Sequence, residues 1–208
     1  IERSTAQLEA ARRLAREEGE ENLVEFRLGD ALEPPLGAEE WGSFDLAHTR
    51  YLLEHVPDPL AVVRIMARAV RPGGRVVLED DDHERMSLWP ELPVFDALWR
   101  VYWNSYRTVG NDPVVGRKLV ALLHKAGLVP RRNHWLFFGS CAGAPDWREV
   151  IDNLVGVIRT ARVQMQQSSS ISPQEQESAL AALVAWSEQP DAALWYPICW
   201  AEGLRKDG

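Results

Sequence analysis

Apolar and polar positions along the chain recur with two periods, one typical of helices and one typical of strands. After Ser4, a good N-cap, apolar residues recur every three or four positions until Gly19, which predicts an amphipathic helix. Residues 23–28 instead alternate between apolar and charged side chains, which predicts a half-exposed strand. Because helices and strands then continue to alternate, the pattern indicates an α/β fold with a mostly parallel sheet.

The remaining elements divide the chain into a core and a helical insertion. Further strands are predicted at 44–49, 75–80, 134–139 and 196–203. Helices are predicted from Asp58 to the Pro72-Gly73-Gly74 turn and at 94–108 and 116–126. Two more are predicted within 141–189, and the polar turn 166–170 separates them. Each of these two begins with a capping box, Asp146 with Glu149 and Ser172 with Glu175. We therefore expect a core of residues 1–140 and 190–208 that includes a cap helix at about 90–110, and an insertion at 141–189.

Composition narrows the class of partner. The 208 residues carry a net charge of −8, and the basic residues are scattered, so we expect no nucleic-acid partner. No apolar run approaches the ~18 residues of a membrane span, so we expect no membrane partner. The two cysteines, Cys141 and Cys199, lie too far apart to suggest a zinc site, and we expect reduced thiols in the cytoplasm. The pattern leaves a homodimer open.

Several polar residues follow predicted strands, where ligands bind in open parallel sheets. Glu2 comes after Ile1 and can accept hydrogen bonds from both hydroxyls of a ribose. Asp30 can accept from the amino group of an adenine, and the Ala31 N–H can donate to its ring. Thr49-Arg50-Tyr51 follows the next strand, and the acidic run 79–82, with His83 behind it, follows the one after.

Taken in order, these segments resemble the class I S-adenosylmethionine-dependent methyltransferases, in particular the bacterial small-molecule branch. The resembling stretches are Ile-Glu-Arg-Ser at the start, Arg-Leu-Gly-Asp-Ala at 27–31, Phe-Asp-Leu-Ala-His-Thr-Arg-Tyr-Leu-Leu-Glu-His-Val-Pro-Asp-Pro at 44–59, Arg-Pro-Gly-Gly-Arg-Val-Val-Leu-Glu-Asp at 71–80, and the helix at 116–128. The likeness covers nearly the whole chain and is loose only after residue 140.

The resemblance implies a three-layer, Rossmann-like fold with a seven-stranded, mostly parallel sheet, in which the strand at 196–203 runs antiparallel. It implies S-adenosylmethionine as the cofactor, with Glu2 on the ribose, Asp30 and Ala31 on the adenine, and Thr49 and Arg50 beside the methionine part. In this family the first strand and a glycine-rich loop come before the position of Glu2. We therefore expect such a segment upstream of Ile1.

Aromatic residues supply candidates for the acceptor site. Trp99, Trp103 and Tyr106 share one face of the helix that follows the acidic run, and with Tyr51 they are predicted to bind the small-molecule acceptor. The alternative for this stripe is ordinary core packing. His83, Asp80 and His55 are weak candidates for proton transfer, and His55 also fits a structural role.

No metal is expected. Thr49 occupies the position where magnesium-dependent relatives place an acidic residue, and the run 79–82 is interpreted as a solvated loop bordering the pocket. The function predicted is methyl transfer to a small-molecule acceptor. Two alternatives stay open: a methyltransferase-like binding or regulatory module, and a nucleotide-dependent oxidoreductase. The second is weakened because no lysine has a tyrosine four residues before it.

Overall fold

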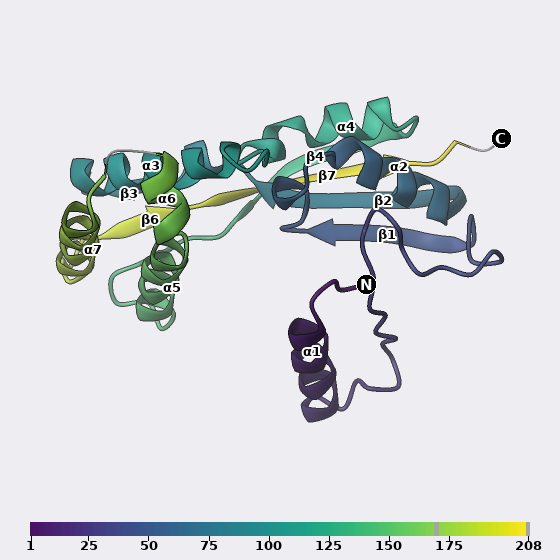
Figure 1. Ribbon diagram of the computed structural model, residues 1–208, viewed down its shortest axis with the longest axis horizontal. Coiled ribbons are helices and arrows are strands. Elements are labelled where there is room, and N and C mark those ends of the chain that lie inside the picture. The colour runs from purple at the N-terminus through teal and green to yellow at the C-terminus, as the bar shows by residue number, and fades with distance from the viewer. Residues whose placement is uncertain (169–170, 207–208) are drawn as a thin grey trace.

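The computed structural model describes residues 1–168 and 171–206, and its main sheet has the spatial order β1-β2-β7-β4. The four strands are β1 (Phe44–Arg50), β2 (Val70–Asp81), β7 (Pro197–Leu204) and β4 (Val129–Phe137). β1 pairs with β2 in parallel, whereas β7 runs antiparallel to both β2 and β4. Three strands therefore share one direction (Figure 1), and the α/β fold with an antiparallel strand near the C-terminus is confirmed.

Two helices, α2 (Pro59–Ala69) and α4 (Leu119–Lys125), pack against the main sheet. Asp58 opens α2 by accepting a hydrogen bond from the Ala61 N–H, and its buried face includes Val62 and Val63. These side chains form one hydrophobic core with Val76 and Leu78 of β2 and with residues of α4. Helix α1 (Thr5–Glu17) stands away from the sheet in Figure 1, so the described residues build two of the three expected layers.

The strand expected at 23–28 does not form. The only pairing there is a single parallel bridge between Glu2 and Leu28, and Leu23 is 80% exposed. Alternating side chains favour a strand only where a neighbouring strand supplies a hydrogen-bonded ladder, and here that ladder is one bridge long. The main sheet thus has four strands within the described residues, and not the seven that the resemblance implied.

The elements that build a second hydrophobic core lie beyond one end of the main sheet (Figure 1). It is built from a small sheet, β3 (Ser87–Trp89), β6 (Ala193–Trp195) and β5 (Ser140–Cys141), and from the helices α3 (Pro93–Arg107), α5 (Trp147–Thr160), α6 (Arg162–Ser168) and α7 (Pro173–Ser187). Helix α3 packs against both α6 and α7. The helix predicted around 94–108 therefore shares its core with the segment predicted as an insertion.

In the described part of this segment there are three helices, where the sequence pattern suggested two. Ser172 forms the expected capping box with Glu175. Asp146 does not cap α5, because its carboxylate accepts a hydrogen bond from the Ser140 hydroxyl instead. The predicted turn 166–170 is helical as far as Ser168, and residues 169–170 lie outside the described part of the chain. Among the described residues, no helix is long and apolar enough to cross a membrane.

Candidate functional site

The carboxyl ends of β1 and β2 meet at one edge of the main sheet, where Arg50 is paired with Glu79. Beyond β1 the chain turns sharply at Tyr51, whose φ of 52° is rare for a residue with a side chain. A short 3-10 turn, η1 (Leu53–His55), follows it, and beyond β2 a second one, η2 (His83–Arg85), begins. The edge thus gathers polar residues from two consecutive crossovers, as predicted for the end of a parallel pair.

Asp80 fixes the position of η1. Its Oδ2 accepts hydrogen bonds from the N–H groups of Leu52 (3.1 Å) and Leu53 (2.7 Å), and its Oδ1 accepts one from Asp81. Asp80 is 0% exposed, so these backbone donors are its partners in place of water. Asp80, which the sequence suggested as a catalytic candidate, therefore holds the start of η1 in place. Glu54, which follows Leu53, is thereby positioned at the end of β2.

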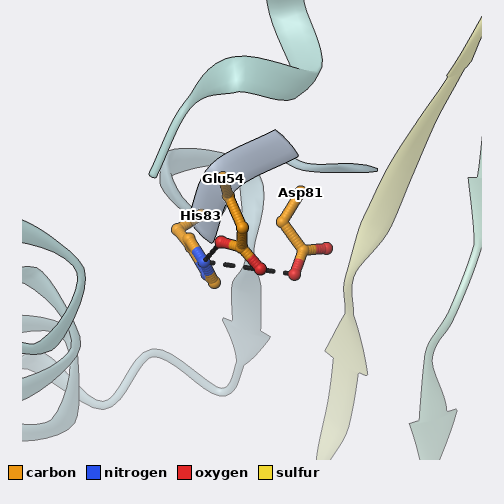
Figure 2. Close-up of side chains that lie close together, drawn as sticks. All are labelled: Glu54, Asp81 and His83. Atoms are coloured by element: carbon orange, nitrogen blue, oxygen red, sulfur yellow. Dashed lines mark hydrogen bonds and ion pairs between the residues drawn. The ribbon is translucent and has the colours of Figure 1, made fainter. Parts of the chain in front are cut away.

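Glu54 and His83 form a buried pair (Figure 2). The His83 Nε2 lies 2.7 Å from Glu54 Oε2, and each side chain is 4% exposed. On its other side, His83 Nδ1 lies 3.0 Å from the hydroxyl of Tyr196. Burial lowers the pKa of His83, so the imidazole is neutral at pH 7 and can accept at one nitrogen while it donates at the other.

Asp81 completes this cluster without a full set of partners. Its Oδ2 lies 4.0 Å from His83 Nε2, whereas its Oδ1 has no hydrogen-bond partner among the described residues. Desolvation raises the pKa of Glu54 to about 7 and that of Asp81 to about 7. Two carboxyl groups that can gain or lose a proton near neutral pH thus face one imidazole, an arrangement suited to moving a proton.

The acidic run was expected to be a solvated loop, and that prediction is wrong. Asp80, Asp81 and Asp82 are 0%, 6% and 2% exposed. The three carboxyl groups have different surroundings. Asp80 accepts hydrogen bonds from backbone N–H groups, and Asp82 forms an ion pair with Arg117. Asp81 keeps one oxygen without a partner among the described residues. The sequence does not show which residues fold against a polar run. The run was therefore predicted to be exposed to solvent.

A cavity of about 290 Å³ opens beside the cluster. Every tyrosine of the chain lines it: Tyr51, Tyr102, Tyr106 and Tyr196. The other lining residues are Glu54, His55, Asp81, His83, Trp99, Phe138, Asn153, Leu154 and Val157. We call this space the tyrosine cavity. It brings together the ends of β1 and β2, helices α3 and α5, and the segment that enters β7.

The structure brings together three of the four predicted acceptor residues. Tyr51, Trp99 and Tyr106 line the tyrosine cavity, and the Trp99 indole N–H donates to the His83 carbonyl at 2.8 Å. Trp103 does not line it: its side chain belongs to the second hydrophobic core and borders a different hollow. His55 lies at the rim and stacks on Tyr106, with ring centroids 5.6 Å apart.

Two of the five predicted cofactor residues line a second, more apolar cavity of about 260 Å³. Ala31 and Thr49 line it, together with side chains of β1 and α2. Glu2 and Asp30 lie close by along the chain and use one carboxylate oxygen each, on the N–H groups of Ser4 and Leu32. Arg50 points elsewhere, with its guanidinium 5.4 Å from the centre of the Tyr51 ring.

This set of residues fits an adenosine-bearing cofactor. The second oxygens of Glu2 and Asp30 accept no hydrogen bond within the described part of the chain, so both remain available to hydroxyl or amino donors. The cavity beside Ala31 and Thr49 offers apolar walls for a flat ring. These assignments stay predictions.

The cluster also bears on the expectation that no metal is needed. Glu54, Asp81 and His83 can present ligand atoms within 4.8 Å of one another, a set that could hold a metal ion. The expectation rested on Thr49, which lies at the cofactor side and does not belong to this set. It therefore stays a prediction to be tested with chelator and added metal.

Sequence reasoning missed four titratable residues of the site: Glu54, Asp81, Tyr102 and Tyr196. Glu54 and Asp81 were visible as acids just beyond two strands, the signal that singled out Asp80 and His83. Tyr102 lies one helical turn from Tyr106, and their hydroxyls are 2.9 Å apart. Tyr196 stands 113 residues from His83 in sequence, and only the fold joins them.

Part of the chain is similar to known methyltransferases. The methyltransferase domain model matches residues 1–78. A demethylmenaquinone methyltransferase of Lactococcus lactis is 35% identical over 98 residues, which are 47% of this chain and 35% of that protein. An uncharacterized 37.1 kDa protein in a Streptomyces fradiae transposon is 36% identical over 130 residues, 61% of this chain and 34% of that protein. The chain thus spans about a third of the length of these relatives.

Solved structures share the fold at low sequence identity. The geranyl diphosphate methyltransferase in complex with SAM superposes with a TM-score of 0.51 at 18% identity, covering 98% of this chain and 66% of that one. The [4+2]-cyclase SpnF superposes with a TM-score of 0.56 at 17% identity, covering 99% and 65%. Residues 1–78 are thus similar to a methyltransferase domain, and the chain shares its fold with solved methyltransferase structures.

Proposed function

We propose that the protein carrying this chain transfers a methyl group from S-adenosylmethionine to a small-molecule acceptor. One observation carries the proposal. Thr49 lines the apolar cavity of the predicted cofactor residues, and Tyr51, two residues later, lines the tyrosine cavity. The end of β1 therefore separates two cavities, one suited to a nucleoside and one suited to an acceptor, as methyl transfer between two ligands requires.

On the cofactor side, Asp30 and the Ala31 N–H would recognise the adenine, and Glu2 would recognise the ribose. Thr49 and Arg50 would then flank the methionine part with their backbone. When bound, S-adenosylmethionine supplies an electrophilic methyl group on its sulfonium. The chain need only orient the acceptor, exclude water and accept any proton that the acceptor loses.

On the acceptor side, the tyrosine cavity supplies both walls and a proton acceptor. Trp99 and Tyr102 are nearly buried, with ring centroids 4.8 Å apart, so they give stiff apolar contact area. Glu54 would receive the proton, directly or through His83, because its carboxyl has a pKa of about 7 and lies in hydrogen-bond contact with the imidazole. His83 and Glu54 would thus accept the proton together, as one hydrogen-bonded pair.

Cofactor binding tests the first half of this proposal. Calorimetry on the full-length protein should show binding of S-adenosylmethionine, and Asp30→Ala should weaken it about five- to thirtyfold through loss of a hydrogen bond of about 1–2 kcal/mol. The matched control is Glu33→Ala, an exposed acid three residues away in the same loop. Unchanged affinity in Asp30→Ala would remove Asp30 from the site.

The fold alone does not decide the reaction, since related folds host different chemistry. An oxidoreductase would bind a nicotinamide dinucleotide more tightly than S-adenosylmethionine in the same calorimeter. A binding module would hold S-adenosylmethionine without producing S-adenosylhomocysteine. For the partners, we further propose a small-molecule acceptor and no nucleic acid, with the cytoplasm as the compartment and a homodimer as the assembly to be tested by light scattering.

A further inference from the structure

We propose that the tyrosine cavity binds a small organic cation, of the class of an alkylated or protonated amine. The inference rests on the proposed function and deepens it, because the amine would be the methyl acceptor. A protonated amine would first lose its proton to Glu54. The lone pair set free on nitrogen would then form the new bond to the methyl group as the bond between that methyl group and sulfur breaks, and S-adenosylhomocysteine would leave. Three observations on the described residues carry it: the aromatic walls, the unbalanced acidic charge and the hydrogen-bond contacts of both ring nitrogens of His83.

The walls of the cavity are rich in aromatic side chains. All four tyrosines and Trp99 line it, and the rings of Tyr102 and Tyr106 lie 5.5 Å apart, edge to face. The faces of tyrosine and tryptophan rings attract cations within about 6 Å of the ring centre. The Tyr51 ring already interacts with one cation, the guanidinium of Arg50. Such walls fit an ammonium group better than a neutral or anionic head.

The charge of the cavity points the same way. Glu54 and Asp81 line it, and no lysine or arginine is among its lining residues. Arg117, the nearest basic partner of the acidic run, is engaged by Asp82 and Glu84. Asp81 Oδ1 has no hydrogen-bond partner within the described part of the chain, and its side chain is 9% exposed. A bound cation would offset this charge, and an N–H donor would satisfy that oxygen.

The arrangement around His83 favours an organic cation over a metal ion. With Glu54 ionised, its carboxylate can only accept, so His83 Nε2 carries the proton and donates at 2.7 Å. His83 Nδ1 then accepts from the Tyr196 hydroxyl at 3.0 Å. In this tautomer neither nitrogen offers a free lone pair to a metal. The two carboxylates remain as the negative partners of a cation held among the rings.

Binding of choline to the full-length protein tests the inference without S-adenosylmethionine. Choline carries a permanent positive charge, and 3,3-dimethylbutan-1-ol has the same shape without it. We expect choline to bind at least about tenfold more tightly than the alcohol. Tyr106→Leu should weaken choline binding about fivefold or more, whereas Tyr106→Phe, which keeps the ring, should stay within about twofold. Asp81→Asn should weaken it as well.

Each other outcome overturns the inference. Equal affinity for choline and its neutral isostere would show that charge is not recognised. Absence of choline binding to a protein that unfolds cooperatively on heating would also overturn the inference. Unchanged choline affinity in both Tyr106→Leu and Asp81→Asn would place the cation elsewhere. Displacement of choline by magnesium would assign the cluster to a metal. S-adenosylmethionine affinity, measured on the same samples, separates failure of this inference from failure of the proposed function.

Discussion

The imidazole of His83 lies 2.7 Å from the carboxylate of Glu54, and both side chains are 4% exposed. The two residues come from separate crossovers, η1 after β1 and η2 after β2. Asp80 ties these crossovers together by accepting the N–H groups at the start of η1. The pair is therefore set by the backbone of the sheet edge, which holds its geometry before any ligand arrives.

Substitution of Trp103 distinguishes a role in core packing from a role in acceptor binding. It is 9% exposed within the second hydrophobic core, so we expect Trp103→Ala to lower the free energy of unfolding by about 3–5 kcal/mol. Trp135→Ala is the control, since Trp135 is 65% exposed and should cost far less. Denaturant titration measures both. A stable Trp103→Ala protein that loses acceptor turnover alone would restore the acceptor-binding role expected from the sequence.

Gly116 allows η3 (Val115–Lys118) to pack against the end of β2. A Cβ at this position would stand 2.6 Å from the Asp81 carbonyl oxygen and 2.8 Å from that of Asp80. Because both atoms are backbone, Gly116→Ala must displace the cluster, and we expect a lower melting temperature and weaker choline binding. Gly156→Ala, in helix α5, meets nothing within 4 Å and should be neutral or stabilising by up to about 1 kcal/mol. Equal melting temperatures would contradict this packing.

Stability should depend on pH through the buried carboxyl groups. Burial raises the pKa of Glu54 and that of Asp81 to about 7, above the values of ~4 expected when unfolded. Their contribution is therefore complete below pH ~4 and is lost as pH rises toward 7, because the folded state must hold or give up protons that the unfolded state has already released. Between pH ~4 and pH 7, the wild type should lose free energy of unfolding on the order of 3 kcal/mol through Glu54, and Glu54→Gln should remove that loss.

Denaturant titrations of the wild type and of Glu54→Gln at pH 5 and pH 8 measure this difference. The comparison is made between the two proteins because His83 acts in the opposite direction: burial lowers its pKa, so its contribution is lost as pH falls below ~6.5. We expect Glu54→Gln to gain stability relative to the wild type at pH 8. Parallel pH profiles would mean that Glu54 does not titrate in this range.

Choline affinity should rise with pH. Choline keeps its charge, whereas Glu54 and Asp81 become ionised as pH passes 7. Asp80, below the cavity, also has its pKa raised to about 7 by burial and adds to the trend. His55 and His83 also line this cavity. Burial lowers the pKa of His83, so any positive charge that it gains at low pH acts in the same direction. The tyrosine hydroxyls stay neutral because burial raises their pKa values. Calorimetry at pH 6 and pH 8 should show severalfold tighter binding at pH 8, and a flat profile would exclude the carboxylates from the site.

Local signals in the sequence predicted local structure well. Asp58 before Pro59 predicted the start of α2, and Ser172 with Glu175 predicted the capping box of α7. These signals succeed because the partner atoms lie within one turn of the chain. The antiparallel strand near the C-terminus followed from the family resemblance and is confirmed as β7.

Long-range partners could not be predicted. Residues 23–28 alternate like a strand, yet only Leu28 pairs, and with Glu2 alone. Residues 80–82 of the acidic run are polar, yet they are buried because Arg117 and the N–H groups of Leu52 and Leu53 fold onto them. The joining of Glu54, His83 and Tyr196 depends on strand order, which no spacing in the sequence contains.

The most direct test of the account is methyl transfer itself. The full-length protein is incubated with methyl-labelled S-adenosylmethionine and a small-molecule extract of the cells that make it, and labelled products are separated by mass and charge. The account predicts S-adenosylhomocysteine and a labelled small amine, both strongly reduced in Glu54→Gln while cofactor affinity is kept. Saturating cofactor binding with no labelled product and no S-adenosylhomocysteine would contradict methyl transfer and favour a binding module.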